Sequence, residues 1–140
     1  MKLYIIRHGE TSWNKAKKLQ GRKDIMLDAD GIRLAELTGE GMKDIDFDLV
    51  ISSPLMRARQ TAELVLAGRE IPMITDKRII EMSFGKWEGE SVRHSEVVTA
   101  EFADKFFNDP YHCPKAPGGE SFRDVLARTA DFYQSLIKNE

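Results

Sequence analysis

The strongest constraint on the fold is the alternation of short apolar runs with segments of helical period. Apolar runs of strand length occupy residues 3–6, 47–53 and 71–75. Strands that alternate with helices predict an α/β fold with a largely parallel sheet. The segments predicted as helices are residues 28–44, where the helical spacing is only rough, and residues 52–68, 97–107 and 121–140. The stretches predicted as loops or irregular structure are residues 12–28, 81–89 and 108–119.

Two of the predicted helices carry signals at their ends. Ser53 is predicted to cap a helix whose first residue is Pro54, and Gly68 to mark its end. Ser121 and Asp124 resemble a capping box with Asp in place of the usual Glu. The apolar face of the first of these helices is predicted to contain Leu55, Ala58, Ala62 and Val65 or Leu66.

Composition bounds the class of protein. A chain of 140 residues is long enough for a real core, and we expect one domain over residues 1–140. Its net charge of -2 favours neither nucleic acid nor a membrane as a partner. One cysteine, Cys113, excludes an intrachain disulfide and fits a reducing compartment. The N-terminus has no signal-peptide pattern and no run approaches a membrane span, so we expect a cytoplasmic protein.

Polar residues follow the first apolar run at the place where a parallel sheet binds its ligands, beyond the carboxyl ends of the strands. Arg7 supplies a cation, and His8 can act as a nucleophile that forms a covalent intermediate. Gly9 permits close approach of the backbone to a ligand, while Thr11 and Asn14 add donors that suit phosphate oxygens. A histidine with a purely structural role is the alternative interpretation.

Arg57 falls in the first turn of the helix after the second apolar run. Helix N-termini attract anions, and a cation there opposes the helix dipole, so an anion is expected nearby. The alternative is a solvated surface arginine.

Glu81 is a candidate acid, because cleavage of a phosphoester needs a proton on the leaving oxygen. It follows Ile79 and Ile80, and partial burial there would keep it protonated. Spacing alone does not choose Glu81 over Glu88.

Four segments together carry a resemblance to a known family. In order along the chain they read LYIIRHGETSWN, FDLVISSPLMRARQTAELV, EMSFGKWEGE and PGGESFRDVLAR. They resemble the histidine phosphatase superfamily, also called the phosphoglycerate mutase-like family, and the resemblance spans essentially the whole chain. It implies a three-layer α/β fold with a mainly parallel sheet. Asp28, where Thr is usual in the family, is expected to cap the 28–44 helix.

The resemblance implies roles for individual residues. His8 matches the nucleophile that takes up the phosphoryl group, Arg7 and Arg57 match the clamps on its oxygens, and Glu81 matches the general acid. The implied activity is metal-independent hydrolysis of a phosphomonoester through a phosphohistidine, with no cofactor. The implied ligand is a small phosphorylated metabolite or inorganic phosphate.

The resemblance also bears on substrate contacts and on the kind of enzyme. Asn14, Gln20 and Gly21 match further phosphate or substrate contacts. FGKWEGE resembles the small phosphatases more than the mutases. A phosphoglycerate mutase-type phosphotransferase and a non-catalytic phosphate-binding protein stay as alternatives.

One family feature has no counterpart in the 140 residues. The family pattern has a second histidine downstream of the helix that begins at Ser121, whereas the other histidines here, His94 and His112, lie in other contexts. We therefore expect a shortened chain that lacks the last strand or strands and helices of the fold and has impaired activity. The strand before Arg7 would then expose unpaired backbone groups, so we expect a homo-oligomer that covers this edge.

Overall fold

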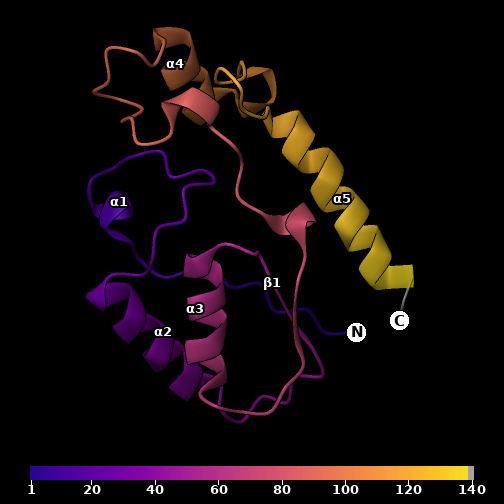
Figure 1. Ribbon diagram of the computed structural model, residues 1–140. Coiled ribbons are helices and arrows are strands. Elements are labelled where there is room, and N and C mark those ends of the chain that lie inside the picture. The colour runs from indigo at the N-terminus through magenta and orange to yellow at the C-terminus, as the bar shows by residue number, and fades with distance from the viewer. Residues whose placement is uncertain (139–140) are drawn as a thin grey trace. The chain divides into compact units, whose positions relative to one another are not determined.

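The computed structural model describes residues 1–138, which form two compact units (Figure 1). Unit 1 comprises Met1–Ser12 and Asp24–Ile80, and unit 2 comprises Trp13–Lys23 and Glu81–Glu140. The expectation of one domain over residues 1–140 stays a prediction.

Unit 1 contains α2 (Ala29–Gly41), β1 (Val50–Ser52), α3 (Met56–Leu66), β2 (Met73–Thr75) and the 3-10 turn η1 (Lys77–Ile79). Unit 2 contains η2 (Gly85–Trp87), α4 (Ala100–Asn108), η3 (Pro110–His112) and α5 (Phe122–Lys138). The one-turn helix α1 (Ser12–Lys15) contains the point where the chain first passes from unit 1 to unit 2.

The sheet of unit 1 confirms the α/β class. β1 and β2 pair in parallel, with Ile51 opposite Ile74. α3, which connects the two strands, packs on β1, and α2 packs on α3. β1 is shorter than the predicted strand over residues 47–53, and Leu49, just before it, is exposed.

The predicted strand over residues 3–6 is wrong. These residues have no regular secondary structure, and the Ile5 side chain is 88% exposed. Within residues 1–138, β1 pairs only with β2, and no described strand bonds to residues 3–6. A strand exists through hydrogen bonds to a neighbour, and an apolar composition alone does not supply them. The described aromatic contact of this segment is the edge of Tyr4 against Phe47, with ring centroids 5.4 Å apart.

α2 begins and packs as its sequence dictates. Asp28 is its N-cap, with Oδ1 accepting the N–H of Gly31 at 2.8 Å, which confirms the predicted cap. Its buried residues, Gly31, Ala35 and Gly39, recur every four residues and are all small. A Cβ on Gly39 would lie 2.8 Å from the carbonyl oxygen of Val65 in α3, so the two helices pack closely because this stripe has almost no side chain.

α3 begins later than predicted. Its N-cap is Leu55, so Ser53 does not cap the helix and Pro54 is not its first residue. The N–H of Met56 is bonded instead to Oδ1 of Asp24 at 2.7 Å. A carboxylate from a distant loop thus satisfies a first-turn N–H that a local hydroxyl was expected to satisfy.

Unit 2 is organised by an aromatic cluster. Trp87 and Phe102 pack edge to face with ring centroids 5.0 Å apart, and Phe102 is fully buried. Phe84 and Phe106 pack against Phe102 as well. Aromatic pairs of this kind add to the stability gained from burial alone, so the predicted loop over residues 81–89 and α4 share one core.

The capping box predicted for α5 is confirmed. The N–H of Ser121 donates to Oδ2 of Asp124 at 2.8 Å, and the N–H of Asp124 donates to Oγ of Ser121 at 3.1 Å. The hydrogen bond from Lys115, followed by those from Ser121, lowers the pKa of Asp124 to about 2. The last two residues of the predicted helix, 139 and 140, lie outside the described residues. Among residues 1–138, no helix has the length and apolar character needed to cross a membrane.

The close packing of α2 predicts opposite effects for two Gly→Ala changes in the same helix. A Cβ on Gly31 would overlap the backbone of Glu10, whereas Gly41 has nothing within 4 Å of the added atom. We expect Gly31→Ala to lower the free energy of unfolding by about 1–3 kcal/mol, as overpacking does. Gly41→Ala should raise it by about 0.5 kcal/mol, because Ala is the better helix former. Urea midpoints measure both, and a midpoint for Gly31→Ala at or above that of the parent contradicts the close packing.

Candidate active site

His8 lies in unit 1 with a half-buried imidazole. Its Nδ1 is 2.7 Å from the carbonyl oxygen of Gly9. A carbonyl oxygen can only accept a hydrogen bond, so Nδ1 carries the proton in this contact. The neutral ring then has its lone pair at Nε2, and Nε2 is the atom that can act as a nucleophile.

Gly9 is held by a hydrogen bond to α3 and by close packing against α2. Its N–H donates to Oγ1 of Thr61 at 2.9 Å, and Thr61 Oγ1 donates to the carbonyl oxygen of Arg57 at 2.7 Å. A Cβ on Gly9 would lie 2.7 Å from the carbonyl oxygen of Gly31 in α2. His8 is therefore positioned by a backbone segment bonded to α3 and packed on α2, and none of the strands within residues 1–138 pairs with it.

Arg57 lies in the first turn of α3 and is only 1% exposed. This burial excludes the alternative of a solvated surface arginine. Arg57 and Thr61 are one helical turn apart, so the hydrogen bonds of Thr61 connect the segment that carries His8 to the backbone of α3 at Arg57. Arg7, next to His8, is exposed.

The Gln20–Gly21 turn lies in unit 2 and is bonded to the segment that follows η2. Gly21 has a φ of 52, and a Cβ there would collide with the carboxylate of Glu88. Oε1 of Glu88 accepts the N–H of Arg22 at 3.0 Å and the N–H of Phe84 at 3.2 Å. Glu88 therefore holds the turn that the family resemblance predicts to contact phosphate or substrate.

The carboxylate of Glu120 also stabilises this turn, through Arg22. The Arg22 side chain bonds to Oε2 of Glu120 at 3.1 Å, and Arg128 bonds to Oε1 of Glu120 at 3.0 Å. Burial raises the pKa of Glu120, but hydrogen bonds from Arg128 and the Ser83 N–H, with the charges of Arg128 and Arg22, outweigh it and lower the pKa. The carboxylate therefore stays charged.

Glu81 lies in unit 2 and is exposed. Its Oε1 accepts the N–H of Met82 at 2.8 Å. The expected partial burial of Glu81 is wrong, because apolar neighbours in the sequence do not by themselves cover a side chain.

The predicted site residues thus fall into two sets. Arg7, His8 and Arg57 belong to unit 1, where hydrogen bonds through Gly9 and Thr61 link the last two. The other set, in unit 2, consists of Asn14 in α1, Gln20, Gly21 and Glu81. Thr61 and Glu88 were not predicted to position anything. The spacing of Thr61, four residues after Arg57, could have indicated it.

Three acidic side chains of unit 1 lie close enough together to be compared with a cation ligand set. Among the described residues, carboxylate oxygens of Glu10, Asp28 and Asp30 lie within 4.8 Å of one another. Oδ1 of Asp28 already caps α2. Acidic groups near the surface commonly cluster without an ion, and we assign no metal site.

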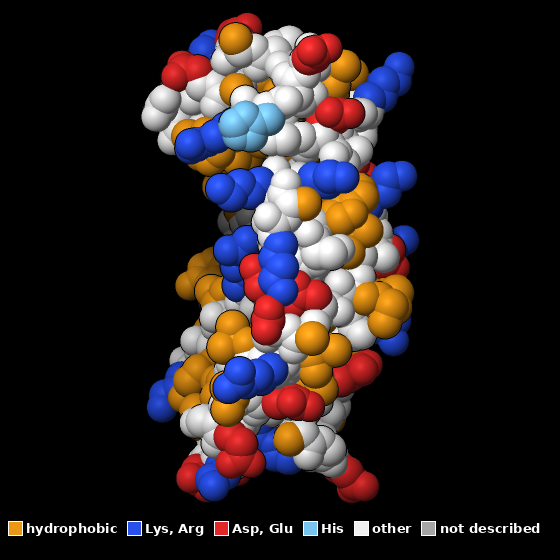
Figure 2. Space-filling view, turned by 90° about the vertical axis from the view of Figure 1, so that its left-hand side faces the viewer, with side chains coloured by type: hydrophobic (Ala, Val, Ile, Leu, Met, Phe, Trp, Pro, Cys, Tyr) orange, Lys and Arg blue, Asp and Glu red, His pale blue; other side chains and the backbone are white. Residues whose placement is uncertain are grey.

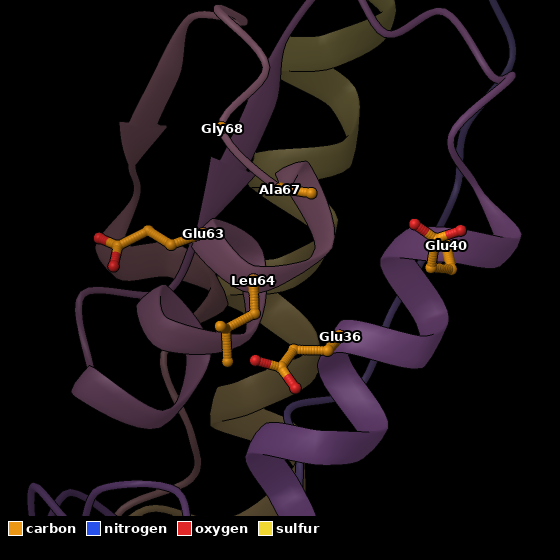
Figure 3. A pocket seen from close by; sticks show the side chains of 6 residues that line it. All are labelled: Glu36, Glu40, Glu63, Leu64, Ala67 and Gly68. Carbon is orange, nitrogen blue, oxygen red and sulfur yellow. The ribbon is translucent and has the colours of Figure 1, made fainter.

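A hollow of about 400 Å³ lies elsewhere in unit 1 (Figure 3). The residues that line it come from α2, α3 and the turn after α3, and are Glu36, Glu40, Glu63, Leu64, Ala67 and Gly68. None of the predicted site residues lines it, so this hollow is not the candidate site. On the face shown in Figure 2, acidic and basic side chains are interspersed, in keeping with a net charge of -2.

The comparison with protein families decides the family. The model of the histidine phosphatase superfamily (branch 1) matches residues 3–140. The chain belongs to this superfamily. Its histidine phosphatase relatives include "Fructose-2,6-bisphosphatase TIGAR" of Xenopus tropicalis, 36% identical over 97% of this chain and 50% of that protein. They also include "Probable phosphoglycerate mutase GpmB" of Proteus mirabilis, 38% identical over 91% of this chain and 59% of the relative.

The solved structures of histidine phosphatases support the fold. The alpha-ribazole phosphatase from Shigella flexneri superposes with a TM-score of 0.85 at 35% identity, covering 96% of this chain and 66% of that one. The α/β fold predicted from the sequence is therefore the fold of the superfamily. The chain spans about half to three fifths of the length of the curated relatives named above.

Proposed function

We propose that the chain hydrolyses small phosphomonoesters without a metal, through a phosphohistidine on Nε2 of His8. The observation that carries the proposal is the hydrogen bond from Nδ1 of His8 to the carbonyl oxygen of Gly9, which leaves the lone pair at Nε2. Nε2 bonds to phosphorus as the ester oxygen departs with the bonding electrons and takes up a proton. Water then attacks the phosphorus, and inorganic phosphate leaves as the Nε2–P bond breaks.

The arginines of unit 1 supply the charge that this transfer needs. A phosphoryl group carries negative charge on its outer oxygens throughout the transfer, and guanidinium groups bind such oxygens in a bidentate manner. In the proposal Arg7 and Arg57 fill this role. Asn14, Gln20 and Gly21 contribute neutral contacts to phosphate or to the rest of the substrate. The burial of Arg57 supports its role, because a fixed cation acts without reorganisation.

Turnover by these 140 residues is expected to be slow. His8 is the single histidine in the sequence of unit 1. His94 and His112 belong to unit 2, and Nδ1 of His112 is bonded to the carboxylate of Asp109 at 2.9 Å. The donor in question is the second histidine of the family pattern, and a site without one such preorganised donor loses on the order of 10²–10³ in rate.

A phosphotransferase of the phosphoglycerate mutase type is the second candidate, favoured by the likeness to GpmB. It would transfer phosphate between hydroxyl groups and need a bisphosphorylated primer. Phosphate binding without turnover is the third candidate. A hydrolysis assay without primer separates the three, because only the hydrolase releases inorganic phosphate under that condition.

The proposal predicts that His8→Ala abolishes release of phosphate from an aryl phosphate. EDTA should leave the rate of the parent within about twofold, since no metal takes part. His94→Ala is the matched control, because His94 is an exposed histidine of unit 2. A rate for His8→Ala equal to that of the parent overturns the phosphohistidine mechanism, and loss of activity in EDTA overturns its independence from metal.

We further propose that Glu81 protonates the leaving group, and the choice between Glu81 and Glu88 is testable. Glu81→Gln should lower kcat on the order of 10²-fold for an alkyl phosphate, whose leaving group needs a proton. It should matter little for an aryl phosphate with an acidic phenol. Glu88→Gln is the matched control, because its amide oxygen can still accept the two N–H groups that bond to Glu88. A large loss of kcat on the alkyl phosphate in Glu88→Gln, with little loss in Glu81→Gln, would make Glu88 the acid.

We also propose that a second copy of the chain covers the apolar segment Leu3, Tyr4, Ile5 and Ile6. All four side chains are exposed, and an exposed apolar run of this kind favours association. We expect sedimentation at micromolar concentration to detect a dimer or larger species. Ile5→Lys should shift the distribution towards monomer, whereas Leu34→Lys, at an exposed position of α2, should not. A stable monomer of the parent rules this partner out.

A further inference from the structure

Thr61 is a buried residue that the proposed mechanism does not use. It lies one turn after Arg57 in α3 and is 5% exposed. A threonine hydroxyl has one proton to donate and lone pairs to accept with. Both functions are used here: Oγ1 donates to the carbonyl oxygen of Arg57 at 2.7 Å and accepts the N–H of Gly9 at 2.9 Å.

These bonds extend to the imidazole of His8. Nδ1 of His8 donates to the carbonyl oxygen of Gly9 at 2.7 Å, and the N–H of the same glycine donates to Thr61. Three hydrogen bonds therefore connect the imidazole to the backbone of α3 at Arg57. Every donor in this series points from the imidazole towards the helix.

We propose that Thr61 is a positioning residue for His8. Its hydroxyl holds Gly9 against α3, and the carbonyl of Gly9 sets the tautomer and direction of the imidazole. The role of the imidazole in phosphoryl transfer rests on the proposed function. The placement of the imidazole by Thr61 does not.

The packing around Gly9 leaves little room for an alternative placement. Gly9 is buried, and a single added carbon atom on it would already lie 2.7 Å from the carbonyl oxygen of Gly31. Without an acceptor at Thr61, the buried Gly9 N–H loses its hydrogen bond, and the backbone at Gly9, which also supplies the acceptor for Nδ1 of His8, loses its bond to α3. Misplacement of a nucleophile by about 1 Å can cost on the order of 10²-fold in rate.

The test compares Thr61→Val, which is similar in shape but has no hydroxyl, with Thr61→Ser, which keeps it. We expect Thr61→Val to lower kcat by about 10- to 100-fold with KM changed less than threefold, and Thr61→Ser to stay within about threefold of the parent. Thr38→Val is the matched control, because Thr38 Oγ1 bonds to the carbonyl oxygen of Leu34 at 2.8 Å in α2 and makes no described contact with the site. Urea midpoints identify the folded variants, and Thr61→Ala takes the place of Thr61→Val where the latter does not fold.

A second readout does not depend on turnover. Nitrogen-15 NMR of the histidine rings distinguishes a protonated Nδ1 from a protonated Nε2, and His8→Ala assigns the His8 signals among the three histidines. We expect the Nδ1–H tautomer in the parent, Thr61→Ser and Thr38→Val, and a mixture of tautomers in Thr61→Val. The parent tautomer and parent kcat in folded Thr61→Val overturn the role of Thr61. Absence of hydrolysis in every protein, with the expected NMR pattern, overturns the proposed function and leaves the role of Thr61 intact.

Discussion

The placement of His8 in unit 1 depends on the two hydrogen bonds of one glycine. The Gly9 N–H reaches α3 through Thr61, and its carbonyl oxygen reaches the imidazole of His8. Only a residue without a side chain fits, because the backbone of α2 at Gly31 is already in contact. The close approach of α2 in turn depends on its stripe of small buried residues. A helix packed at ordinary distance would leave the segment that carries His8 without support.

The parts of the fold that depend on local chemistry could be predicted from the sequence. Asp28 caps α2 and Ser121 pairs with Asp124, because each cap is complete within three residues. The start of α3 could not be predicted, since its first N–H is satisfied by Asp24 from another loop. The strand over residues 3–6 failed for a related reason. Its apolar pattern says that the residues prefer burial, whereas a strand requires a partner that no local pattern reveals.

The candidate site likewise contains residues that could be predicted from the sequence and residues that could not. Arg57 was identified because a cation at a helix N-terminus is unusual, and its burial agrees with a specific role. Thr61 was not predicted as a site residue. The predicted apolar face of this helix contains Ala58 and Ala62, whereas the buried face contains Arg57 and Thr61. Glu81 was expected to be half-buried from its apolar neighbours, but its exposure depends on how those neighbours pack. Residue type and spacing thus indicate which side chains take part in the reaction, whereas tertiary contacts decide which residues position those side chains.

The hydrogen bond at Nδ1 of His8 would also contribute during the proposed reaction. As Nε2 donates its lone pair to phosphorus, positive charge develops over the imidazole ring, and Nδ1–H becomes a stronger donor. The carbonyl of Gly9 already faces that proton at 2.7 Å, so this bond strengthens as the transition state forms. An interaction that is stronger in the transition state than in the ground state accelerates the chemical step. A backbone carbonyl would thus do for His8 what a carboxylate does for the histidine of a serine protease. Since the carbonyl is neutral, its effect depends on direction more than on charge, and therefore on whatever fixes Gly9.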